Sequence, residues 1–138
     1  MTAVDQEQTD AIRQLVPFAA ALGVEVIASS PDEVRARVDW RPERCTTADV
    51  LHGGVIMSLA DTTGAMCAFQ NLPDGAGGTT TIESKTNFLR AVREGYAEAA
   101  SRPLHAGRTV VVVETDVTDA DGQPVAKVLQ TQAVLREG

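Results

Sequence analysis

Hydrophobic and polar residues alternate along much of the chain, which is the pattern of strands with one buried face. The clearest case is residues 34–40, where apolar side chains occupy every second position and charged ones stand between them. The four consecutive valines at 110–113 indicate instead a central strand covered on both faces. The strands expected from these patterns are 24–27, 34–40, 79–89, 96–102, 109–118 and 124–135.

One long segment departs from this period. Residues 53–72 are apolar almost all round and stop before Pro73, so they predict a buried helix rather than a strand. A shorter helix interrupted by Pro17 is expected over residues 11–22. Residues 1–10 are polar and acidic, and we expect a flexible tail there.

The element order is therefore helix, two strands, one long helix and four strands. It predicts an α+β fold in which a curved antiparallel sheet wraps the long helix, with loops at 41–51 and a turn from Pro103 to Gly107. At ~150 residues per domain, a chain of 138 residues makes one domain, 1–138. Apolar helix surface that the sheet leaves uncovered would need a partner subunit, so we expect a homo-oligomer.

Composition narrows the possible partners. The 12 basic and 19 acidic residues give a net charge of −7, which argues against nucleic acid or an anionic membrane surface. The acidic N-terminus does not resemble a signal peptide, and a cytoplasmic protein is expected. Cys45 and Cys67 have no metal-binding spacing, and the two histidines lie far apart, so we expect no metal site.

Two features of the long helix point to chemistry. The first is His52-Gly53-Gly54 at its start, where free N–H groups favour negative charge and glycine lets a ligand approach the backbone. Glycine there is equally well explained as a cap or a close-packing residue. The second is Asp61, a carboxylate in an apolar helix with no Lys or Arg from residue 53 to residue 84.

A buried carboxylate without a cation is costly, so Asp61 is expected either to face a wet cleft or to serve as an acid or base. The alternative is an aspartate on the exposed edge of the helix, held by Thr62 or a backbone group. Ser58, Asp61, Thr62 and Ala65 share one helix face, which we expect to line the cleft. Eight residues separate Gly53 from Asp61, or ~12 Å along the axis, so a site that uses both would combine two subunits.

The element order, the spacing from His52-Gly53-Gly54 to Asp61 and the later run Asn87-Phe88-Leu89-Arg90 resemble the hotdog-fold acyl-CoA thioesterases. The most similar branch is the PaaI-like group of phenylacetic acid degradation. The resemblance covers roughly residues 15–136. It implies hydrolysis of an acyl-CoA thioester to a free acid and coenzyme A, with no further cofactor, in a dimer or a dimer of dimers whose active site lies at the dimer interface.

The resemblance also implies residue roles. Asp61 corresponds to the catalytic carboxylate, acting as a general base on water or as a nucleophile, and the Gly53 N–H corresponds to the donor that polarises the thioester carbonyl. His52 is expected near the thioester, and Thr81 stands where the group often carries a Ser or Thr that positions the water. Thr46 departs from the group, which usually has Asn or Gln there.

The remaining candidates for substrate contact are weaker and are listed together: Gly54, Ser58, Thr62, Lys85, Arg90 and Arg93. The three basic residues could bind the phosphates of coenzyme A or could be solvated strand charges. The acyl group stays open between small aryl or phenylacetyl types and medium chains. Two other functions remain alternatives: a non-catalytic acyl-CoA-binding module, and a hotdog hydratase or dehydratase acting on 3-hydroxyacyl thioesters.

Overall fold

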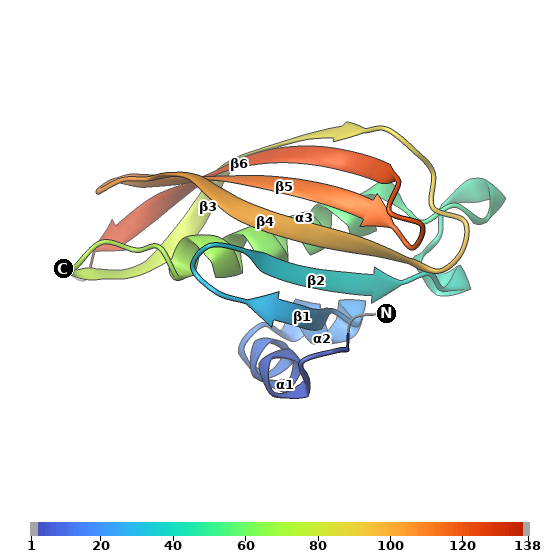
Figure 1. The fold of residues 1–138 in the computed structure, drawn as a ribbon, viewed down its shortest axis with the longest axis horizontal. Helices are drawn as coiled ribbons and strands as arrows, with labels where there is room; N and C mark the ends of the chain where they lie inside the picture. The colour runs from blue at the N-terminus through green and yellow to red at the C-terminus, as the bar shows by residue number, and fades with distance from the viewer. Residues whose placement is uncertain (1–2, 137–138) are drawn as a thin grey trace.

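The computed structural model describes residues 3–136 and has the predicted α+β architecture (Figure 1). Its elements in chain order are α1 (Gln6–Leu15), α2 (Pro17–Leu22), β1 (Glu25–Ser29), β2 (Val34–Asp39), the 3-10 turns η1 (Pro42–Arg44) and η2 (Thr47–Asp49), α3 (Gly53–Phe69), β3 (Ala76–Phe88), β4 (Tyr96–Ala106), β5 (Val110–Asp119) and β6 (Pro124–Arg136). No helix among the described residues is long and apolar enough to cross a membrane.

The six strands form one antiparallel sheet in the order β1-β2-β4-β5-β6-β3, and α3 lies along its concave side (Figure 1). Leu59 and Ala60 of α3 are fully buried in a core with inward-facing side chains of β2, β4, β5 and β6. On β4 two of these side chains are Ala97 and Ala99, and their small size allows the helix to lie close to the sheet. The long buried helix predicted from the sequence is thus confirmed, ending at Phe69 rather than residue 72.

The valine run of β5 corrects one expectation. Val111 and Val113 are buried against α3, whereas Val110 and Val112 on the other face are partly exposed. A single layer of helix covers only one side of this sheet, so within the chain β5 has the alternating burial of an ordinary antiparallel strand.

The predicted flexible tail is also wrong, because α1 begins at Gln6 (Figure 1). The Asp5 side chain caps this helix by accepting a hydrogen bond from the Gln8 N–H at 3.1 Å. Thr9 is buried and accepts from the Val26 N–H at 2.9 Å, which ties the helix to β1. Residues 1–2 of the expected tail lie outside the described part of the chain.

Proline has different effects at its two predicted breaks. At Pro17 the break is confirmed, since α1 ends before it and Pro17 occupies the first turn of α2. At Pro103 the expected turn is wrong, because β4 continues to Ala106 through a register shift between Pro103 and His105. An irregular position of this kind tolerates the missing N–H of proline.

Candidate active site

The start of α3 leaves one backbone donor free. His52 is the N-cap in extended backbone (φ −60°, ψ 135°), and its Nδ1 accepts a hydrogen bond from the Gly54 N–H at 2.7 Å. None of the hydrogen bonds among residues 3–136 uses the Gly53 N–H. The first N–H groups of a helix sit at the positive end of its dipole, so this donor is suited to a carbonyl oxygen that gains charge.

The two glycines have different roles. A Cβ on Gly54 would lie 2.9 Å from His52 Nδ1, so glycine there makes room for the histidine cap, in agreement with the capping interpretation. A Cβ on Gly53 would lie 3.1 Å from the ring of Phe88, at the end of β3. Gly53 therefore keeps its backbone accessible beside an aromatic side chain.

Asp61 lies about two turns further along α3 and is exposed, so the expectation of a buried carboxylate is corrected. Its side chain borders an opening between α3, α1 and β3 instead of facing the core. Oδ1 accepts hydrogen bonds from Thr81 Oγ1 at 2.9 Å and from Gln130 Nε2 at 2.5 Å. Asp61 thus faces a cleft, as one interpretation predicted. It is exposed, as the helix-edge alternative also required, but Thr81 and Gln130 hold its side chain rather than Thr62.

A β-bulge brings Thr81 to Asp61. Thr81 pairs with Gln132 on β6, whereas Ser84, three residues later, pairs with Gln130, only two residues away. Ile82 is the extra residue, and its side chain is exposed. The bulge lets Thr81 and Ser84 face α3 together, a common use of bulges beside active sites.

Sequence reasoning missed two glutamines of β6 that complete this network. Gln130 and Gln132 are 0% and 1% exposed, and Gln132 Nε2 donates to Thr81 Oγ1 at 2.6 Å. Asp61, Thr81 and the two amides thus form a connected group of side chains from three elements. Two amides on the buried face of a strand were the available signal, because buried polar groups require partners.

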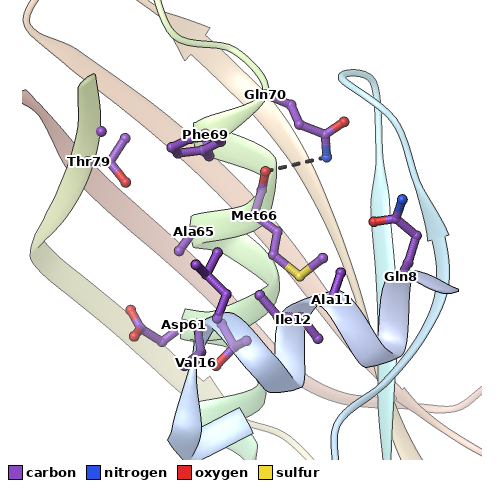
Figure 2. A pocket seen from close by; sticks show the side chains of 13 residues that line it. Gln8, Ala11, Ile12, Val16, Asp61, Ala65, Met66, Phe69, Gln70 and Thr79 are labelled. Atoms are coloured by element: carbon purple, nitrogen blue, oxygen red, sulfur yellow. Dashed lines mark hydrogen bonds between the residues drawn. The ribbon is translucent and has the colours of Figure 1, made fainter. Parts of the chain in front are cut away.

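A pocket of ≈ 500 Å³ opens beside Asp61 (Figure 2). Its walls are mainly apolar and are formed by α1, by α3 and by the start of β3; they include Ile12, Leu15, Val16, Ala65, Met66 and Phe69. Asp61 and Thr62 also line it, which confirms that this helix face borders a cleft. Ser58 is the exception: it does not line the pocket, and its Oγ donates to the Gly54 carbonyl at 2.7 Å.

The other predicted contacts lie away from this pocket. Thr46 is exposed in the loop before α3, where its N–H donates to the Val50 carbonyl at 2.8 Å. Lys85 is exposed on β3 next to the inward-facing Ser84, on the opposite face of the sheet. Arg90 borders a separate cavity with Arg93, so the structure does not gather the basic residues around Asp61.

The cysteines do not supply a nucleophile. Cys67 is fully buried on α3, as expected of a small hydrophobic residue, and burial raises the pKa of its thiol to about 11. The thiolate form that attacks an electrophile is therefore disfavoured at neutral pH.

Known proteins share this architecture. The family model described as "Thioesterase superfamily" matches residues 48–126. A Mycobacterium tuberculosis protein named as an esterase, Rv1847, is 32% identical over 114 residues, 81% of each chain. Its solved structure has a TM-score of 0.85 at 29% identity, covering 89% of this chain and 99% of that one.

Two further structures bear on the assignment. A mutant thioesterase from Pseudomonas aeruginosa, PA1618, has a TM-score of 0.87 at 26% identity, covering 96% of this chain and 95% of that one. PaaI from the phenylacetic acid degradation operon of E. coli has a TM-score of 0.82 at 21% identity, with 96% and 93% covered, and that likeness is one of fold. The chain therefore belongs to the thioesterase superfamily and is a hotdog-fold thioester hydrolase.

Proposed function

We propose that the chain hydrolyses acyl-CoA thioesters to the free acid and coenzyme A, and that it needs no further cofactor. The observation that carries this proposal is Asp61, a carboxylate anchored by Thr81 and Gln130 at the mouth of an apolar pocket. An apolar pocket would accommodate the acyl group, and a carboxylate at its edge could act on the thioester carbonyl carbon.

In this mechanism the Gly53 N–H polarises the thioester carbonyl, and Asp61 either takes a proton from water or attacks the carbonyl carbon itself. On the first route the hydroxide adds to the acyl carbon, the C–S bond breaks, and the proton leaves with the coenzyme A thiolate. On the second route an Asp61 carboxylate oxygen adds to the acyl carbon and the C–S bond breaks, which gives an acyl–aspartyl anhydride and the coenzyme A thiolate. Water then cleaves the anhydride, returning the free acid and the Asp61 carboxylate and supplying the proton of the coenzyme A thiol. His52, as the cap that orders this turn, and Thr81, as a partner of Asp61, assist both routes.

A homodimer completes the site. Gly53 and Asp61 stand ~12 Å apart on one helix, too far for one thioester carbonyl to contact both. Among residues 3–136, β3 pairs only with β6, so its other edge is open there. Ile82, Phe88 and Leu89 are exposed at or near this edge. Two chains paired through β3 would place Gly53 of one beside Asp61 of the other; a dimer of dimers would contain the same site.

The pocket suits a phenylacetyl-type or a medium-chain acyl group, because its walls are mainly aliphatic with Phe69 at one side (Figure 2). In the assembled protein Lys85, Arg90 and Arg93 are the proposed contacts for the phosphates of coenzyme A. Thr46, Gly54 and Thr62 are proposed to shape the rest of the substrate site.

The test is thiol release from a panel of acyl-CoAs, from acetyl through decanoyl to benzoyl and phenylacetyl, for the wild type and Asp61→Asn. We expect one acyl class to be favoured and kcat to fall at least about 100-fold in Asp61→Asn, with binding of a non-hydrolysable acyl-CoA analogue retained. Asp32→Asn, an exposed carboxylate in the β1–β2 turn, is the matched control. Binding of the analogue without thiol release from any thioester would instead indicate a binding module.

A further inference from the structure

Gln130 is a fully buried amide whose contacts are not explained by packing alone. Its Nε2 lies 2.5 Å from Asp61 Oδ1, 3.3 Å from Thr81 Oγ1 and 3.5 Å from the Asp61 carbonyl oxygen. Its Oε1 is buried and has no hydrogen-bond partner among the described residues. A buried acceptor without a partner is destabilising, so an apolar side chain of similar length would serve packing better.

Gly64 provides the space that this amide occupies. It lies inside α3, three residues after Asp61, where glycine is destabilising relative to alanine. A Cβ at this position would lie 1.9 Å from Gln130 Oε1. Two residues that are each unfavourable for stability therefore fit one another, and together they bring the amide N–H to Asp61.

The two carboxylate oxygens of Asp61 are hydrogen-bonded unequally. Thr81 and Gln130 both donate to Oδ1, whereas no hydrogen bond between residues 3 and 136 reaches Oδ2. Two donors on one oxygen fix the rotation of the carboxylate and keep the second oxygen available. We propose that Gln130, in the space left by Gly64, is a positioning residue that holds Oδ1 so that Oδ2 acts on the thioester. This rests on the proposed hydrolysis at Asp61.

The direct test is Gln130→Met, which keeps the length of the side chain and removes the donor. Loss of a hydrogen bond to a charged group predicts a fall in kcat of about 10- to 100-fold. KM should stay within a factor of about two, because the amide contacts Asp61 and not the pocket. Calorimetric titration with a non-hydrolysable acyl-CoA analogue counts the sites of the variant that still bind substrate. The melting temperature of Gln130→Met should not fall below that of the wild type.

A packing role predicts the reverse pattern: a lower melting temperature, fewer competent sites and an unchanged kcat per site. That result would overturn the proposal. A wild-type chain that hydrolyses no acyl thioester would overturn the proposed function and the role of Gln130 together. Normal wild-type activity with a fully active Gln130→Met would overturn the role of Gln130 alone.

A double-mutant cycle with Gly64 provides a second, independent readout. Gly64→Ala should push the amide away from Asp61 and reduce kcat nearly as much as Gln130→Met does. In a Gln130→Ala background the added methyl group meets no amide, so Gly64→Ala should reduce kcat further by less than about twofold. Equal losses in the two backgrounds would show that Gly64 and Gln130 act separately and would contradict the proposal.

Discussion

His52 organises the start of α3 through one ring nitrogen. Its Nδ1 accepts a hydrogen bond from the Gly54 N–H at 2.7 Å. This hydrogen bond uses the Gly54 N–H, whereas no hydrogen bond among residues 3–136 uses the Gly53 N–H, which is the proposed substrate donor. His52, which was predicted to lie near the thioester, therefore also has a structural role, because it caps the first turn of α3, where the proposed donor Gly53 lies.

This role predicts a difference between two substitutions of His52. His52→Ala removes the acceptor and should lower the free energy of unfolding by about 1 kcal/mol, whereas His52→Asn can still cap the helix and should lose much less. Urea unfolding at neutral pH measures both values. If His52→Ala and His52→Asn are equally stable, the cap contributes nothing and the histidine is there for the substrate alone.

The sequence analysis predicted four catalytic residues, and the structure shows why it missed the two glutamines that contact Asp61 and Thr81. His52, Gly53 and Asp61 stand out because they interrupt an apolar helix, and Thr81 was found through the family resemblance. Gln130 and Gln132 occupy a strand in which both faces mix apolar and polar residues, so the pattern does not indicate which face is buried. Only the pairing of β6 with β3 shows that they face Asp61.

At the scale of elements, local patterns identified α3 and most of the strands, and the errors came from tertiary contacts. The segment of α1 is too polar to suggest a helix alone, and its stability depends on Thr9 and Arg13 bonding to the backbone of residues 24–26. The shift in β4 at Pro103 likewise depends on pairing with β5. The partners of these two segments, residues 24–26 and β5, lie too far along the chain to be detected from a local pattern.

The outer face of the sheet carries a charge network that joins three strands and a turn. Arg102 on β4 contacts Glu33, Glu114 and Asp116, and Lys127 on β6 contacts Glu114 and Asp116. Burial alone would raise the pKa of Asp116, but hydrogen bonds from Lys127 and Arg102 outweigh it and lower that pKa below the ordinary value. The folded state therefore favours the charged carboxylate of Asp116.

Because the pKa of Asp116 is lower in the folded state, its charged carboxylate stabilises the fold at any pH above the pKa of an unfolded Asp, about 3.9. This stabilisation is lost as the pH falls through the lower pKa of the folded state. We expect Asp116→Asn to be less stable than the wild type at pH 7, with the difference narrowing below about pH 4. Urea unfolding from pH 7 to pH 3 tests this. A difference independent of pH would contradict it, and because the network is partly exposed, high salt should reduce the difference as well.

In the whole molecule, the two groups proposed to act on the thioester lie apart on α3. Gly53 presents its donor at one end of α3, and Asp61 stands two turns away beside the pocket. β3 ends at Phe88, whose ring lies close to Gly53, and Thr81 of the same strand donates to Asp61. One edge strand therefore lies beside both residues. Pairing of two chains through this edge would unite them and would also cover the exposed apolar residues.

Hybrid dimers test whether the Gly53 N–H of one chain and Asp61 of another act on the same thioester. Gly53→Pro removes only this donor, since proline fits the first helical position and His52 already has the extended backbone that precedes proline. Gly53→Ala adds a Cβ at the same place but keeps the N–H, so it is the matched control.

Homodimers of Gly53→Pro and of Asp61→Asn should each be nearly inactive. A hybrid purified through two different affinity tags contains one intact pair, Gly53 from the Asp61→Asn chain with Asp61 from the Gly53→Pro chain. We expect this hybrid to recover about half of the wild-type rate per dimer, because one of its two symmetric sites is intact. A hybrid as inactive as its two parents would contradict the shared site.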